Sequence, residues 1–95
     1  MRIVFLEPAH REMEEAIAYY NAHQSGLGDA FRKIIDETLS LISEMPLLFP
    51  TAHDPIRKAV LKRFPYTLFY SVDTLNETVI VVAVAHQHKK PQSFV

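Results

Sequence analysis

The stretch TVIVVAVAH, residues 78–86, decides the fold because it is apolar at nearly every position. A strand with one solvated face alternates apolar and polar residues, whereas a strand covered on both faces reads as a continuous apolar run. We therefore expect residues 78–86 to form a central strand, buried between layers or between neighbouring strands. The run is far shorter than the roughly 20 apolar residues that a membrane-spanning helix needs.

Three further strand patterns accompany this central strand. Residues 57–63 and 66–72 form two of them, with Pro65 at the bend between them. Residues 73–76, Asp-Thr-Leu-Asn, then supply a turn into the central strand, because Asp and Asn favour turn conformations. Residues 2–6 form a shorter strand pattern at the other end of the chain.

Two segments between these strands carry apolar residues at helical spacing. The first opens at Pro8, whose missing N–H costs nothing in the first turn of a helix, and it fades near His23. Its apolar face is predicted to contain Ala9, Met13, Ala16, Ile17 and Tyr20. The second follows Ser25, a candidate N-cap, and ends at Pro46. Its apolar face is predicted to contain Leu27, Phe31, Ile34, Ile35, Thr38, Leu41, Ile42 and Met45.

The predicted order is strand, helix, helix, strand, strand, strand, in a single α+β domain covering residues 1–95. Two amphipathic helices joined by a short break pack as an antiparallel hairpin. We expect this hairpin to cover one face of an antiparallel sheet, with a proline-containing loop over residues 47–55 as the connection. The chain contains no internal repeat and no linker that would separate a second domain.

Positive charge is concentrated in the C-terminal part of the chain. Residues 1–55 hold four Lys or Arg and nine Asp or Glu, whereas residues 56–95 hold six and two. The resulting net charges of −5 and +4 are hidden in the overall charge of −1. Such asymmetry hints at recognition of an anionic partner. A charged edge strand that opposes aggregation would account for part of it equally well.

The residue types present exclude several kinds of site. Without cysteine, the chain has neither a disulfide framework nor a thiolate ligand. Its first apolar run is too short for a secretory signal, so we expect a cytoplasmic protein that does not associate with membranes. His86 and His88 could supply two metal ligands, but no third ligand follows at a suitable spacing. We expect no metal and no cofactor, with His86 hydrogen-bonded at the end of its strand and His88 in solvent.

Several different short motifs follow one another along nearly the whole chain in a characteristic order. They are Pro8-Ala9, the Gly26–Phe31 junction, Arg57, Phe64-Pro65-Tyr66, Phe69-Tyr70, and Ala83-Val84-Ala85-His86 followed by Pro91 and Phe94. In this order and spacing they resemble the RelE/ParE superfamily of bacterial type II toxins. The resemblance implies the toxin of a toxin–antitoxin module, of the kind that stabilises plasmids. It also implies an antitoxin whose C-terminal segment wraps around the toxin.

Two branches of this superfamily differ in chemistry. RelE-like members cleave mRNA in the ribosomal A site, whereas ParE-like members poison DNA gyrase and carry no nuclease activity. RNA cleavage needs a base, an acid and cations at the scissile phosphate. RelE-like tails supply an aromatic hydroxyl and arginines, but this chain has Phe94 and Lys89-Lys90 and is slightly acidic overall. The resemblance therefore favours a ParE-like gyrase inhibitor that is not an enzyme.

The favoured interpretation includes a ParD-like, ribbon-helix-helix antitoxin and no sequence-specific binding of nucleic acid. Two alternatives stay open. The first is a RelE-like, ribosome-dependent mRNA endonuclease, for which Lys62, Arg63 and His86 are the candidate catalytic residues. The second is a non-toxic member of the superfamily that only binds partners.

Candidate binding residues follow from the same interpretation. For the target we expect the helical hairpin and the C-terminal segment to contribute Tyr19, His86, His88, Lys89, Lys90 and Phe94. For the antitoxin's acidic residues we expect Arg57, Lys58, Lys62 and Arg63, since electrostatic steering speeds the capture of a partner. The aromatic residues within 64–70 could stack on bases, but large aromatics in strands usually pack in a core.

Overall fold

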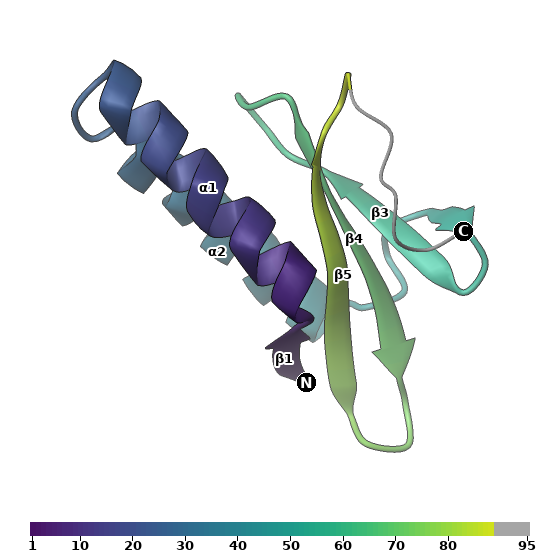
Figure 1. Ribbon diagram of the computed structural model, residues 1–95. Helices are drawn as coiled ribbons and strands as arrows, with labels where there is room; N and C mark the ends of the chain where they lie inside the picture. The colour runs from purple at the N-terminus through teal and green to yellow at the C-terminus, as the bar shows by residue number, and fades with distance from the viewer. Residues whose placement is uncertain (89–95) are drawn as a thin grey trace.

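A hairpin of two helices lies on one face of a five-stranded sheet in the computed structural model, which describes residues 1–88 (Figure 1). The elements are β1 (Arg2–Phe5), α1 (Glu7–His23), α2 (Leu27–Glu44), β2 (Thr51–His53), β3 (Ile56–Val60), β4 (Tyr66–Asp73) and β5 (Thr78–His86). The predicted α+β architecture is confirmed. Neither α1 nor α2 has the length and hydropathy needed to cross a bilayer.

The sheet has the strand order β1-β5-β4-β3-β2, so the apolar strand β5 lies between β1 and β4. Strand β4 runs antiparallel to β5 and β3, and β3 runs antiparallel to β2. In contrast, β1 pairs in parallel with β5, with Arg2 opposite Thr78 and Phe5 opposite Val81. The sheet is therefore mixed rather than antiparallel as expected. Parallel pairing needs a long connection, which the helical hairpin and the other strands supply.

Four local expectations were wrong. The 47–55 loop contains the short strand β2, whose three residues are too few to show a period. The next strand ends at Val60 instead of residue 63, because a tight turn with Arg63 at φ 68° follows. Gly26, at φ 84°, takes the N-cap position that was expected for Ser25. Leu41 and Met45 are 39% and 49% exposed, since one lies at the margin of the apolar stripe and the other follows the last helical turn.

The two helices approach each other closely at Gly28. Its backbone N–H donates to Asn21 Oδ1 at 2.7 Å, so a side chain of α1 satisfies one of the free N–H groups that open α2. A Cβ at position 28 would overlap the carbonyl oxygen of Ile17 and lie 2.6 Å from Asn21 Cγ. Glycine is required here by the space between the helices and not by backbone conformation.

The core fills the space between the hairpin and the helix-facing side of the sheet. Its largest fully buried side chains are Tyr70, Phe31, Ile35, Ile42, Leu68, Val79, Val81 and Val84. At one end, the Phe31 ring lies 5.1 Å from the ring of Phe64 and 5.0 Å from that of Tyr66, measured between centroids. These edge-on contacts confirm that Phe64 and Tyr66 pack as core aromatics.

Strand β5 contains one extra residue. Phe69 pairs with Ala83 and Tyr70 with Val81, so Val82 is left without a partner in β4. Such a β-bulge shifts the side-chain alternation by one position. As a result Val81 and Val84, three residues apart, both join the core on the helix-facing side.

Glu12 links α1 to the upper half of β5. Strand β1 ends early, and its last contact is the N–H of Leu6 with the carbonyl oxygen of Val81 at 3.0 Å. Beyond that point the N–H of Val84 donates to Glu12 Oε1 at 2.8 Å. A carboxylate thus takes the place of the missing strand and holds the end of β5 against the hairpin.

Two side chains of the sheet fasten the segment that follows α2. The Tyr70 hydroxyl donates to the carbonyl oxygen of Pro46 at 2.7 Å. Arg57 Nη1 donates to the carbonyl oxygen of Phe49 at 2.7 Å and to that of Leu47 at 3.4 Å. Burial raises the pKa of Tyr70, and the Arg57 guanidinium offsets part of that rise.

Replacing Gly28 by alanine should destabilise the fold by about 1–3 kcal/mol, because overpacking forces the two helices apart. Urea unfolding followed by circular dichroism measures this loss. The matched control is Gly26→Asn, since position 26 has nothing within 4 Å of a Cβ and asparagine tolerates positive φ. Equal stability of Gly28→Ala and the wild type would contradict the close approach.

Tyr70→Phe should cost about 1 kcal/mol at neutral pH, because the hydrogen bond to Pro46 is lost. The substitution should also change the alkaline response. A raised pKa in the folded state means that stability is complete below the unfolded value of about 10 and falls as the pH rises above it. Unfolding midpoints measured from pH 7 to pH 11 should therefore fall less steeply in Tyr70→Phe than in the wild type. An identical decline in both proteins would exclude this role for Tyr70.

Candidate functional site

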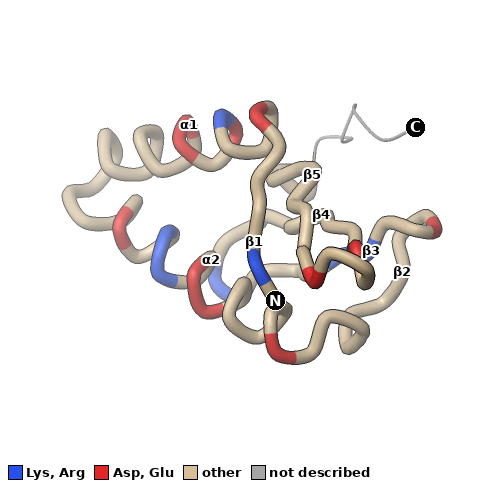
Figure 2. The backbone as a smooth tube through the Cα atoms, turned by 90° about the horizontal axis from the view of Figure 1, so that it is seen from below, with Lys and Arg blue, Asp and Glu red and all other residues tan. Residues whose placement is uncertain are grey.

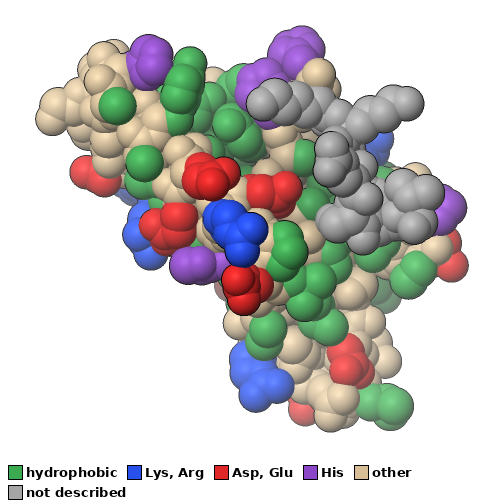
Figure 3. All heavy atoms as spheres, viewed as in Figure 1, with side chains coloured by type: hydrophobic (Ala, Val, Ile, Leu, Met, Phe, Trp, Pro, Cys, Tyr) green, Lys and Arg blue, Asp and Glu red, His purple; other side chains and the backbone are tan. Residues whose placement is uncertain are grey.

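Rings from three distant segments form a continuous chain at the end of the molecule where α1 and β5 both terminate. The ring centroids of Tyr19 and Tyr20 are 5.6 Å apart, and those of Tyr20 and Tyr66 are 6.2 Å apart. His86 lies 5.2 Å from Tyr66 and 5.2 Å from His88. We call this set, together with His23, the aromatic end. Histidine side chains lie along the upper edge of the face shown in Figure 3, with hydrophobic side chains between them.

Tyr19 is the most exposed tyrosine of the aromatic end, at 57%. Its ring lies 4.2 Å from the His23 ring, and His23 Nδ1 lies 3.0 Å from the Tyr19 carbonyl oxygen. The neighbouring imidazole therefore restrains an aromatic side chain that projects into solvent.

The Tyr20 and Tyr66 phenols of the aromatic end remain protonated at neutral pH. Burial raises the pKa of Tyr20 and of Tyr66, and the neighbouring tyrosines raise both further. Within residues 1–88, the hydroxyls of Tyr19, Tyr20 and Tyr66 take part in no hydrogen bond, whereas that of Tyr70 does.

Basic groups border the aromatic end, and acidic groups are absent from the segments that build it. Residues 16–24, 61–66 and 84–88 contain no Asp or Glu, and they include Lys62 and Arg63. The Arg63 guanidinium lies 5.5 Å from the centroid of the Phe64 ring, which in turn lies 5.1 Å from that of Tyr20. The turn of the helical hairpin carries no charged residue, while both signs are mixed along α2 (Figure 2).

The two histidines at the end of β5 contact each other directly. The N–H of His88 donates to His86 Nδ1 at 3.1 Å, so this nitrogen acts as an acceptor. His86 also pairs with Tyr66 across the sheet, and His88 is exposed. Among residues 1–88, no three His, Cys, Asp or Glu side chains lie close enough to hold a metal ion.

The four basic residues assigned to the antitoxin do not form one continuous rim. Arg57 points toward the helix-facing side and binds loop carbonyls, whereas Lys58 lies on the outer face, the side of the sheet turned away from the helices. Lys62 and Arg63 are exposed in the β3–β4 turn. Arg57 and Lys58 thus lie on opposite faces of the sheet, and the four charges are separated.

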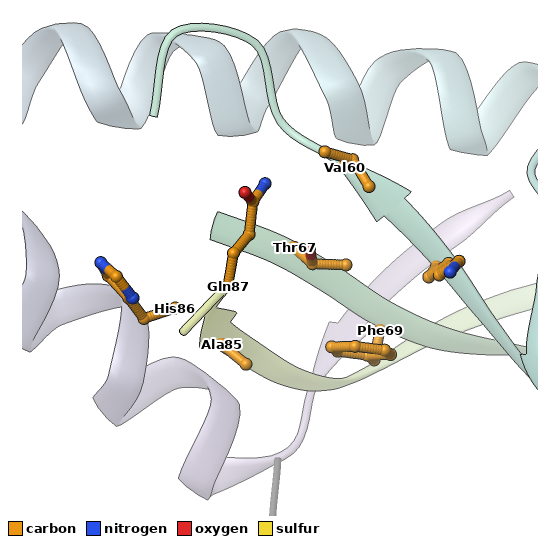
Figure 4. Close-up of a pocket in the computed structure, with 7 residues that line it drawn as sticks. Val60, Thr67, Phe69, Ala85, His86 and Gln87 are labelled. Atoms are coloured by element: carbon orange, nitrogen blue, oxygen red, sulfur yellow. The ribbon is translucent and has the colours of Figure 1, made fainter. Parts of the chain in front are cut away.

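A shallow cavity of about 300 Å³ lies on the outer face (Figure 4). Lys58 is the one Lys, Arg, Asp or Glu among the described residues that line it, and the others are Val60, Thr67, Phe69, Ala85, His86 and Gln87. The His86 ring points away from the Thr67 and Phe69 side chains in the close-up (Figure 4). This arrangement combines a single cation with largely apolar walls.

Lys89, Lys90 and Phe94, three of the residues predicted to contact the target, lie outside the described residues. Tyr19, His86 and His88 are brought to the same end of the molecule. Tyr20 and Tyr66 were predicted from the sequence to be core residues only, although their rings link Tyr19 to His86. The pairing of Tyr66 with His86 depends on strand register, which no motif reveals.

The fold is shared with solved toxin structures. The isolated E. coli RelE toxin is 22% identical, with a TM-score of 0.72 over 94% of this chain and 86% of that one. The toxin in the intact E. coli RelBE toxin–antitoxin complex is 21% identical, with a TM-score of 0.71 over 93% and 98%. A chain of the chromosomal ParDE system from P. aeruginosa is 11% identical, with a TM-score of 0.64 over 90% and 95%. At these identities the likeness shows the fold alone.

Sequence comparison identifies the family. No curated protein is significantly similar to this chain. The family model described as the ParE toxin of the type II toxin–antitoxin system parDE matches residues 3–91, which is most of the chain. This chain therefore belongs to the ParE family of type II toxin–antitoxin toxins.

Proposed function

We propose that this ParE-family toxin inhibits DNA gyrase by binding to it in the cytoplasm, without catalysing a reaction. A ParD-like antitoxin of the ribbon-helix-helix type neutralises it. Membership of the ParE family supports this proposal over an mRNA endonuclease, because ParE-like toxins act on gyrase and RelE-like toxins cleave mRNA.

One structural observation carries the preference for binding over catalysis. The groups that a nuclease would use are dispersed among the described residues. Arg57 binds loop carbonyls, and Lys62 and Arg63 are exposed in the β3–β4 turn. Lys58 and His86 line the cavity on the outer face, but the His86 ring points away from the Thr67 and Phe69 side chains (Figure 4). A general base must lie within hydrogen-bond reach of the proton it removes, with cations beside the same phosphate. Dispersed groups favour recognition of a partner.

An antitoxin partner fits the relatives of known structure. Two of them are named as the ParDE system and the RelBE toxin–antitoxin complex. In this chain Lys58 offers a cation on the outer face beside Val60 and Phe69, next to the cavity described above. We assign this face to the antitoxin, since a cation with apolar neighbours suits an acidic and partly apolar segment.

Induction of the chain alone in a bacterial host tests the proposed target. Incorporation of labelled thymidine should fall before incorporation of labelled amino acids, because gyrase inhibition stops replication first. The purified toxin should also block supercoiling by purified gyrase and cause cleaved DNA to accumulate. Earlier failure of translation, with cleaved mRNA on ribosomes, would refute gyrase as the target.

A chain that ends at His88 tests the role of the tail. It keeps the hydrogen bond from Gln87 N–H to the Pro65 carbonyl at 2.8 Å and the one from His88 N–H to His86 Nδ1. The truncated protein should therefore fold, with a far-ultraviolet spectrum like that of the full chain, but should no longer inhibit growth. Full toxicity of the truncated chain would remove residues 89–95 from the mechanism.

A further inference from the structure

The aromatic end brings together residues that were each predicted from the sequence to contact the target. Tyr19 comes from the last turns of α1, and His86 and His88 come from the end of β5. Tyr20 and Tyr66 join them through ring contacts of 5.6 Å, 6.2 Å and 5.2 Å. We infer that the aromatic end, with Arg63 at its border, is the surface that binds an acidic segment of the toxin's protein target. The inference rests on the proposed function and adds the surface and the chemistry of the partner.

Charge and hydrogen-bonding capacity indicate an acidic partner. The segments that build this surface contain Lys62 and Arg63 but no carboxylate. Three phenol hydroxyls face no acceptor within the described residues, and carboxylates accept hydrogen bonds from both phenols and guanidinium groups. Among the glutamates of α1, Glu12 accepts the hydrogen bond of the Val84 N–H and Glu14 lies 3.6 Å from His10. Glu15 stands one helical turn before Tyr19 and is the carboxylate nearest to it along the helix.

The ring geometry favours a protein over a nucleic acid. Tyr20 and Tyr66 meet at an interplanar angle of 69°, and Tyr66 and His86 at 81°. Edge-on packing uses ring faces inside the cluster, whereas binding of single strands needs open faces and a track of cations. Two basic residues in these segments and a net charge of −1 provide little attraction for a phosphate backbone. Tyrosine and arginine, which this surface combines, are instead enriched at protein–protein hot spots.

The location favours the target over the antitoxin. Lys58 and its apolar neighbours lie on the outer face, whereas the rings of Tyr20 and Tyr66 pack on the helix-facing side with Phe31. Apart from His86, which also lines the outer-face cavity, the side chains of the two surfaces therefore lie on opposite sides of the sheet.

The test uses two exposed positions that can change without disturbing the core. Tyr19→Ala removes the projecting ring, and Arg63→Asn removes the guanidinium with a residue that tolerates φ 68°. Each variant should need about 10-fold more protein for half-maximal inhibition of gyrase, as truncation of a hot-spot residue predicts. Each should also lose growth inhibition at equal expression, with its thermal midpoint unchanged. Tyr19→Phe, which keeps the ring, should recover part of the activity.

Matched controls separate this surface from general effects. Leu75→Ala truncates a side chain that is 95% exposed in the β4–β5 turn, and Arg32→Asn removes an exposed guanidinium from α2. Both controls should inhibit gyrase and growth like the wild type. Losses of the same size in the controls would overturn the inference.

The remaining outcomes are also decisive. If Tyr19→Ala and Arg63→Asn stay as toxic as the wild type, the aromatic end is not the target surface. If the two variants keep full toxicity but no longer bind the co-expressed antitoxin, the aromatic end is an antitoxin surface. If they lose only binding to duplex DNA, the aromatic end is a nucleic-acid surface. If the wild type inhibits growth but not gyrase, the proposed target fails, and the comparison of variants in cells still decides the inference. A wild type that inhibits neither would overturn both.

Discussion

The burial of β5 between two neighbouring strands is the constraint on which the rest of the structure depends. A buried backbone N–H without an acceptor costs about 1–3 kcal/mol, so every edge of this strand must be paired. Strand β4 pairs one edge along its length, but β1 pairs only the first half of the other. Glu12 completes the second half through the N–H of Val84. One carboxylate therefore ties α1 directly to the part of β5 that leads into the aromatic end.

Much of this architecture could be predicted from local patterns. The apolar run over residues 78–86 predicted a central strand, and the apolar faces of α1 and α2 predicted the hairpin. The bulge at Val82 could not be predicted, because valine and alanine occupy both faces of β5 and give no alternation to shift. The parallel pairing of β1 was equally hidden, since a four-residue strand carries no signal of its partner. Gly28 stood out in the sequence only as part of the junction between the helices, and its steric role depends on how closely they pack.

The candidate site was predictable in its parts and not in its assembly. Exposure of Tyr19 followed from its place beside the apolar stripe, and the two histidines stood out at the end of an apolar strand. Their connection depends on Tyr20 and on the pairing of Tyr66 with His86, which are products of register and packing. Arg57 illustrates the opposite case. Its alternation with Lys58 predicted opposite faces, but the path of the 47–49 backbone that it binds could not be read from the sequence.

The parallel pairing of the first strand with the last has a consequence for biosynthesis. The sheet cannot close until residues 78–81 have left the ribosome, because β1 has no other neighbour in the strand order. At roughly 5–20 residues per second, several seconds separate the synthesis of β1 from that of β5. During that interval the apolar side chains of α1 and α2 lack strand β5, against which they pack in the finished fold. The sheet therefore matures only after residues 78–81 have been synthesised, which leaves time for an antitoxin already present to meet the toxin as it folds.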